Sequence, residues 1–170
     1  MGEAALRDKV ELGELLARLC RGMDRADEEL VAACYTEDSV DRHGTFEGTG
    51  REFASYICRE SPVSGSARFL HHSLGQSLFE VDGDRATGET YFSFHMATGP
   101  DLLFQGIGRY VDVFARVDGR WLIAQRTVVT EWTGQHQVRT VGPTADDYVG
   151  TRDTTDPVYS VLLGAAGGAG

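Results

Sequence analysis

Apolar side chains recur at intervals of three and four between residues 7 and 23, which is the spacing of one face of an amphipathic helix. These positions are Leu12, Leu15, Leu16, Leu19, Cys20 and Met23. Asp27 is a candidate N-cap for a second helix over residues 28–35, because its carboxylate can accept from the first backbone N–H groups. Residues 40–46 alternate as a short strand, and residues 51–59 have the pattern of a third helix. The N-terminal part of the chain is therefore predicted to be mostly helical.

From Phe69 onward the pattern changes to alternation between apolar and polar positions. Four long runs are separated by short turns that carry glycine, and they cover residues 69–81, 85–97, 102–117 and 120–133. Short turns between alternating runs predict antiparallel hairpins, and strands of this length must twist and curl. We expect an α+β fold in which three N-terminal helices close the concave face of a strongly curved, mostly antiparallel sheet.

Two adjacent histidines stand at the start of the first long strand. Because successive strand side chains point to opposite faces of a sheet, only one of His71 and His72 can face a given pocket. His95 and Arg126 are polar residues within otherwise apolar strands, so each is either a solvent-facing side chain or a site residue. The opposed directions of His71 and His72 argue against a metal site built from both.

Three more polar residues allow two interpretations. Asp24 follows the first helix, where the helix dipole does not favour a carboxylate, and it is either an exposed turn residue or part of a site. Asp41 and His43 share one face of the short strand and form either a site or a surface pair.

Composition and charge exclude several classes of protein. The formal net charge of -10 opposes binding to a phosphate backbone, so nucleic acid is not an expected partner. No apolar run approaches the about 18 residues that a membrane helix needs, and residues 1–10 lack the core of a signal peptide. We therefore expect a cytoplasmic protein with no membrane partner. Its three cysteines are scattered, which favours buried thiols over disulfides.

The order of elements, three helices and then a curled antiparallel sheet, resembles the nuclear transport factor 2-like superfamily, and several local motifs resemble its SnoaL-like branch. The motifs that carry the resemblance are Arg21–Asp27, Cys34–Gly44, His72 with Gln76, Glu89–His95, Gly108–Asp112, Asp118–Trp121 with Arg126, Arg152–Asp153 and Asp156–Tyr159. The resemblance covers nearly the whole chain, and it implies a cone-shaped α+β barrel.

The resemblance also implies site residues. In active members such as scytalone dehydratase, bile acid 7α-dehydratase and hexachlorocyclohexane dehydrochlorinase, an aspartate after the first helix and a histidine on the sheet form a dyad. The matching positions here are Asp24 and His72. His95 matches a second pocket histidine, and Arg126 resembles a strand arginine that points into the cone. One relative has an active-site tyrosine at the position of Leu19. A phenol in this site would therefore have to come from another tyrosine.

Aromatic side chains are the expected substrate-binding residues. Tyr35, Tyr56 and Tyr91 are the candidates for the missing phenol. A cone lined by aromatic residues suits a flat, mostly apolar cyclic ligand with a few oxygens, such as a polyketide, aromatic or steroid-like compound. The lining residues predicted on this basis are Tyr91, Phe104, Tyr110 and Trp132.

These expectations favour a cofactor-independent, dehydratase-type lyase. An imidazole can take a proton near neutral pH while a carboxylate orients it, and this chemistry needs no cofactor and no metal. Isomerisation, cyclisation or cofactor-free oxygenation would fit the same pocket. The other class of function is a ligand-binding or assembly module without catalysis. The resemblance further implies a homo-oligomer, either a dimer or a trimer.

The chain is long enough for one domain and a tail. We expect residues 1–134 to form the domain and residues 135–163 to form an extension that packs on the domain or on a neighbour. The glycine- and alanine-rich residues 164–170 are expected to be a disordered tail.

Overall fold

The computed structural model of the chain describes residues 2–61, 64–99 and 101–166. Its helices are α1 (Glu3–Arg25), α2 (Glu28–Ala32), α3 (Gly50–Ser55) and α4 (Pro157–Ala166), and one π-helical turn (Tyr56–Glu60) continues α3. Its strands are β1 (Tyr35–His43), β2 (Phe46–Gly48), β3 (Phe69–Asp82), β4 (Arg85–Gly99), β5 (Leu102–Val117) and β6 (Arg120–Gln137). The three N-terminal helices and the four long strands confirm the element order predicted from the sequence.

The strands form a single sheet in the order β2-β1-β6-β5-β4-β3. The hairpins from β3 to β6 are antiparallel, and β1 returns to lie parallel to β6. With β2 and β3 at opposite edges, the sheet curves without closing into a barrel. The α+β class is confirmed, and the expected barrel is an open cone.

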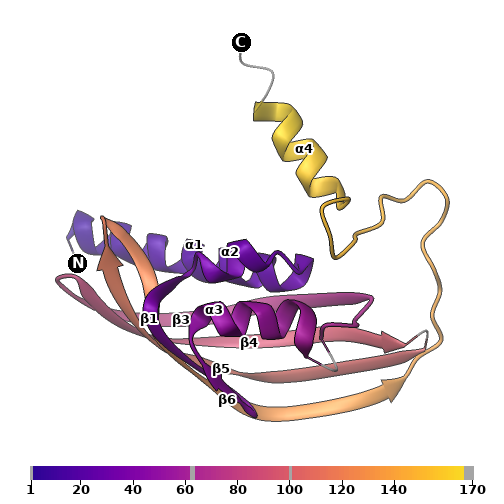
Figure 1. The fold of residues 1–170 in the computed structure, drawn as a ribbon, viewed down its shortest axis with the longest axis horizontal. Helices are drawn as coiled ribbons and strands as arrows, with labels where there is room; N and C mark the ends of the chain where they lie inside the picture. Colours follow the sequence, from indigo (N-terminus) through magenta and orange to yellow (C-terminus); the bar gives the residue numbers. More distant parts are fainter. Residues whose placement is uncertain (1, 62–63, 100, 167–170) are drawn as a thin grey trace.

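Figure 1 shows α1, α2 and α3 on one face of this sheet and α4 standing away from it. The apolar stripe of α1 is buried, as its spacing predicts. It joins the side chains of the sheet, among them Phe92, Tyr110 and Phe114, in one hydrophobic core. No helix within the described parts of the chain is long and apolar enough to cross a bilayer.

The junction between α1 and α2 is defined by local geometry. Ala26 follows α1 in the left-handed region, with φ at 52°, and its N–H bonds to carbonyls of the last helical turn. Asp27 then caps α2 by accepting from the backbone N–H of Leu30 at 3.0 Å, as predicted. The chain therefore turns sharply at Ala26, just after the helical turn that carries Asp24.

The second helix is shorter than its sequence pattern predicts. It ends at Ala32, although the pattern predicted a helix over residues 28–35. Strand β1 begins at Tyr35, earlier than the predicted start at residue 40. Tyr35 lies beside Ile123 in the parallel pairing with β6, and the Ile123 N–H donates to the Cys34 carbonyl at 2.9 Å. Pairing with a distant strand thus outweighs the local helical pattern.

The region after residue 134 begins within the sheet, because β6 continues to Gln137. A long connection follows, and residues 151–159 return to contact the end of α1. Helix α4 includes residues 164–166 of the segment that we expected to be disordered, and residues 167–170 lie outside the described residues.

Candidate functional site

Asp24 and His72 meet where the last turn of α1 lies against the start of β3. The Nδ1 atom of His72 is 2.6 Å from Oδ1 of Asp24, and the backbone N–H of His72 donates to Oδ2 at 3.0 Å. Both carboxylate oxygens therefore bind the same residue, which fixes the plane of the carboxylate relative to the ring. The His72 and Asp24 side chains are only 6% and 9% exposed.

This arrangement defines what the imidazole can do. A carboxylate at Nδ1 holds the proton of a neutral ring on that nitrogen, so Nε2 carries the free lone pair. Nε2 can then accept a proton, and Asp24 would stabilise the imidazolium that results. The geometry is that of a general base with its orienting carboxylate.

His72 lines a cavity of about 180 Å³ between the concave face of the sheet and the π-helical turn after α3 with the loop that follows it. Most of its wall is apolar, and the apolar side chains are Ile57, Leu70, Phe92, Phe94, Met96, Phe104 and Val128. The polar side chains that line it are His43, Tyr56, Ser61, Ser64, His72 and Thr130. Such a cavity suits a mostly apolar ligand that presents a few polar groups.

Gly108 in β5 leaves space for the ring of Phe92 on the cavity wall. A Cβ atom at Gly108 would lie 2.3 Å from the Val129 carbonyl oxygen and 3.0 Å from the Phe92 ring. No larger residue fits there unless the backbone moves. The absence of a side chain lets Phe92 lie across β5, stacked on Tyr110 at 4.2 Å between ring centroids.

His95 lies away from this cavity. Its neighbours in β4, Phe94 and Met96, line the cavity, and alternation along the strand turns His95 to the opposite face. There it pairs across the strands with His71, which is exposed. The structure therefore does not bring His95 to the Asp24–His72 pair.

The predicted aromatic lining divides into three groups. Tyr56 and Phe104 line the cavity, whereas Tyr35 and Tyr110 are buried in the core and do not line it. Tyr91 lies on the outer face of β4, the same face as His95, and is 37% exposed.

Trp132 is also on the outer face, 46% exposed, because of a bulge in β6. Thr130 pairs with Gly108 and Trp132 pairs with Ile107, so Glu131 is an extra residue in the register. One extra residue reverses which side chains face the core from that point on. Thr130 lines the cavity, and Trp132 points to the other side of the sheet.

Arg126 is fully buried but belongs to the core beneath the cavity. Its Nε and Nη2 atoms donate to the two carboxylate oxygens of Asp112 at 2.8 and 2.7 Å. Its guanidinium also lies 3.9 Å above the centre of the Tyr110 ring. This bidentate pair commits Nε and Nη2 to Asp112, and Arg126 is not among the residues that line the cavity.

A second histidine of the cavity is His43, which the sequence pattern left as either a site residue or a surface residue. It stacks on Phe53 at 4.9 Å, and its Nδ1 atom lies 3.8 Å from Oδ1 of Asp41. Oδ2 of the same carboxylate accepts from the Tyr35 hydroxyl at 2.7 Å. Burial lowers the pKa of His43 to about 3 and raises that of Asp41 to about 6.

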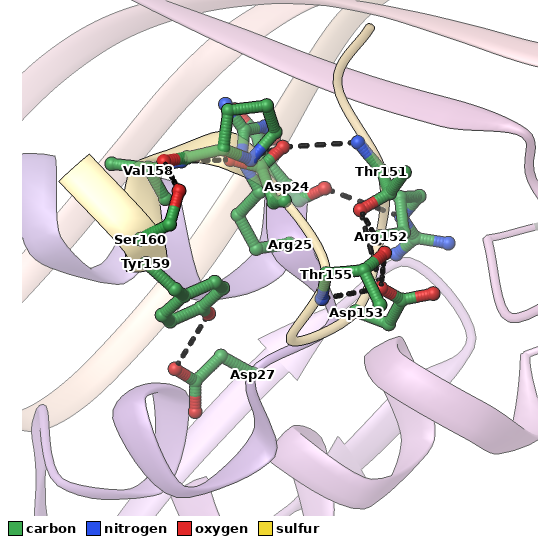
Figure 2. Close-up of polar contacts among 12 residues, drawn as sticks. Asp24, Arg25, Asp27, Thr151, Arg152, Asp153, Thr155, Val158, Tyr159 and Ser160 are labelled. Carbon is green, nitrogen blue, oxygen red and sulfur yellow. Dashed lines mark hydrogen bonds and ion pairs between the residues drawn. The ribbon is translucent and has the colours of Figure 1, made fainter. Parts of the chain in front are cut away.

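Residues Thr151–Tyr159, which we call the C-terminal clamp, make polar contacts with the residues around Asp24 (Figure 2). Arg152 donates to the carbonyl oxygens of Met23 at 3.1 Å and of Asp24 at 3.3 Å. Asp156 pairs with Arg25 at 3.2 Å, and the Tyr159 hydroxyl donates to Asp27 at 3.0 Å. Residues distant in sequence therefore fix the position of the C-terminal end of α1.

The described residues contain no group of three or more His, Cys, Asp or Glu side chains arranged to hold a metal ion. The chemical groups that the cavity offers are imidazoles, hydroxyls and aromatic rings.

Solved structures of several proteins resemble this one. A protein from Novosphingobium aromaticivorans, provisionally named scytalone dehydratase, aligns with a TM-score of 0.70 at 20% identity, over 86% of this chain and 99% of the other. The type 3 hexachlorocyclohexane dehydrochlorinase LinA from Novosphingobium barchaimii aligns with a TM-score of 0.70 at 17% identity, over 82% and 97%.

A third structure is that of a variant of Rv3472, a protein of unknown function from Mycobacterium tuberculosis. It aligns with a TM-score of 0.66 at 27% identity, over 96% of this chain and 90% of the other. No curated protein matches the chain in sequence. The model of the SnoaL-like domain matches residues 4–127, which include Asp24, His43 and His72. The chain therefore belongs to the SnoaL-like domain family, within the nuclear transport factor 2-like superfamily.

Proposed function

We propose that this protein is a cofactor-independent, dehydratase-type lyase that acts on a cyclic polyketide, aromatic or steroid-like ketone. The observation that carries the proposal is the Asp24–His72 pair on the wall of an apolar cavity, with both carboxylate oxygens engaged by His72. A base held in one orientation within a mostly apolar cavity is suited to remove a proton from carbon.

The proposed reaction eliminates water from a hydroxy-ketone. Nε2 of His72 takes the proton from the carbon next to the carbonyl, and Asp24 stabilises the imidazolium. The C–O bond of the neighbouring hydroxyl then breaks as the carbon–carbon double bond forms. The imidazolium returns its proton to the departing hydroxyl, which leaves as water and restores the neutral base.

Two structural neighbours support this class of reaction. The names dehydratase and dehydrochlorinase denote the elimination of water and of hydrogen chloride. Both reactions can begin with removal of a proton from carbon. The neighbours support the fold and the reaction class, and the proposed substrate class is supported by the mostly apolar, partly aromatic lining of this chain's own cavity.

The proposal is tested by turnover of a panel of hydroxy-ketone polyketide, naphthol and steroid-type compounds without added cofactor. Loss of one water from the substrate is followed by mass spectrometry. Asp24→Asn and His72→Ala should each lower turnover by roughly 10²-fold or more. His71→Ala is the matched control, because His71 is adjacent in sequence but exposed, and it should retain activity.

Conversion that survives both substitutions would place the chemistry on other residues. If no compound is converted but one binds saturably to the wild type and to both variants, the protein is a binding module and the lyase proposal is wrong. A product of unchanged mass would replace elimination by isomerisation or cyclisation.

A further inference from the structure

His43 is the second imidazole on the cavity wall, and it comes from a different element than His72. It ends β1, and its ring is fixed by stacking on Phe53, with an interplanar angle of 18°. Its side chain is 26% exposed, whereas its Nδ1 atom is fully buried. The exposed edge of the ring, which faces the cavity, is therefore the edge opposite Nδ1, where Nε2 lies.

The hydrogen-bond pattern behind the ring sets its tautomer. Within the described residues, His43 Nδ1 and Asp41 Oδ1 are both buried without a hydrogen-bond partner, and they are 3.8 Å apart. Tyr35 occupies the other oxygen of Asp41 with its hydroxyl. A small rotation of the ring or carboxylate closes the gap, and the proton of Nδ1 then satisfies Oδ1. In this tautomer Nε2 presents a lone pair to the cavity.

We propose that His43 contacts the ligand directly and accepts, through Nε2, a hydrogen bond from a hydroxyl group on an aromatic or polycyclic ligand. The cavity wall supports this ligand class, because the rings of Phe92, Phe94 and Phe104 line it and suit a flat ring system. A buried acceptor that receives no donor costs free energy, so ligands that bring a hydroxyl to this position are preferred.

The charge state of the ring agrees with this role. Burial lowers the pKa of His43 to about 3, and the charges of Arg126 and His72 act in the same direction. At neutral pH the ring is therefore uncharged, and an uncharged imidazole carries one donor and one acceptor. His43 would select a hydroxyl of the ligand while His72 removes a proton elsewhere on it.

This inference rests on the proposed function only in taking the same cavity as the ligand site. Its test is therefore an equilibrium measurement that needs no turnover. The probes are 2-naphthol and 2-methoxynaphthalene, which have the same ring system, but only the first can donate a hydrogen bond. Their dissociation constants are measured by calorimetry for the wild type, His43→Phe and His43→Gln. His71→Phe is the control on the outer face.

In the wild type, 2-naphthol should bind roughly five- to tenfold more tightly than the methoxy compound, the ratio expected for one hydrogen bond. His43→Phe keeps an aromatic ring for stacking on Phe53 but has no nitrogen, so the ratio should fall toward one. His43→Gln carries an acceptor oxygen near the place of Nε2 and should restore part of the ratio. His71→Phe should leave it unchanged. A purely structural role for His43 would weaken both probes equally and leave the ratio as it is.

A second measurement uses only the wild-type protein, so it remains valid if the variants fail to fold. Long-range ¹H–¹⁵N spectra of the imidazoles should show His43 with its proton on Nδ1, and its Nε2 resonance should shift when 2-naphthol is added. A proton on Nε2, a ratio that persists in His43→Phe, or no binding of either probe by the wild type would each overturn the inference. The lyase proposal is judged separately, by turnover in the Asp24 and His72 variants.

Discussion

Arg152 binds the backbone of Asp24 across 128 positions of sequence, with its Nε atom donating to the Asp24 carbonyl oxygen at 3.3 Å. The same guanidinium donates to the Met23 carbonyl on α1 and to the Ser64 and Ala67 carbonyls on the other side. Ser64 lines the cavity. Arg152 therefore connects the end of α1, which carries Asp24, to the loop around Ser64, which lines the cavity.

Replacing Arg152 by methionine should destabilise the protein and weaken the site together. The substitution leaves these carbonyls without their donor, which should lower the free energy of unfolding by about 1 to 3 kcal/mol. Turnover should fall as well, because the end of α1 is free to shift relative to β3. Urea denaturation and turnover measure the two effects. Arg139→Met is the control, since Arg139 is exposed.

Arg152→Lys tests whether charge alone is enough. The N–H donors of an ammonium group all lie on one nitrogen atom. Lysine therefore cannot bind the carbonyls at the end of α1 and those of the loop around Ser64 at the same time, as the planar guanidinium does. The lysine variant should therefore recover only part of the lost stability. Full recovery would show that the clamp acts through its charge and not through its geometry.

Periodicity predicted the elements of this fold well, because it reports burial. The stripe of α1 and the four long strands follow directly from alternation at intervals of 3.6 and 2. The pairing of Asp24 with His72 was predicted only through the family resemblance, since no local pattern connects an aspartate on a helix to a histidine on a strand. The structure places the two side chains in contact.

Periodicity could not say which face of each strand is concave. The pattern of β4 separates Tyr91 and His95 from Phe92 and Phe94, but the choice between the two faces depends on where the helices pack. The bulge at Glu131 leaves no clear signal in the sequence, and it reverses the direction of Trp132. Tyr91 and Trp132, which we predicted to line the cavity, therefore lie on the outer face instead.

The two faces of the sheet lead to a direct comparison of histidines. His95→Ala should retain turnover close to that of the wild type, because His95 lies on the face opposite the cavity. His72→Ala should lose it by roughly 10²-fold or more. Turnover of a common substrate by both purified variants measures the difference. An equal loss in the two would contradict the assignment of faces.

Arg126 and Asp112 should behave as a buried structural pair. Replacing Arg126 by methionine leaves the Asp112 carboxylate buried and unpaired, which should cost about 3 to 5 kcal/mol of unfolding free energy. Asp112→Leu should be similarly harmful because it leaves the guanidinium unpaired. The double variant should be more stable than the sum of the two single losses predicts.

A double-mutant cycle by chemical denaturation measures this coupling. Turnover per folded molecule should change less than stability, because Arg126 is enclosed by its own partners and does not line the cavity. If Arg126→Met folds normally and loses turnover, Arg126 would be a catalytic residue after all.

His43 and Asp41 should give opposite contributions to stability as the pH falls. The pKa of His43 is lowered from 6.5 to about 3 in the folded protein, so between these values the unfolded chain binds more protons and acid removes stability. The pKa of Asp41 is raised from 3.8 to about 6, so in that interval the folded protein binds more protons and acid adds stability. The charged or titratable groups near His43 are Asp41, Arg126 and His72.

His43→Phe should therefore lose less stability than the wild type between pH 7 and pH 5, by about 2 kcal/mol. Asp41→Asn should shift the balance the other way and lose more. Urea denaturation of the three proteins at both pH values measures these differences, and comparing each variant with itself cancels any cost of the substitution at neutral pH. Parallel pH dependence in all three would mean that His43 is not held uncharged by burial, because an exposed imidazole binds its proton equally well in both states.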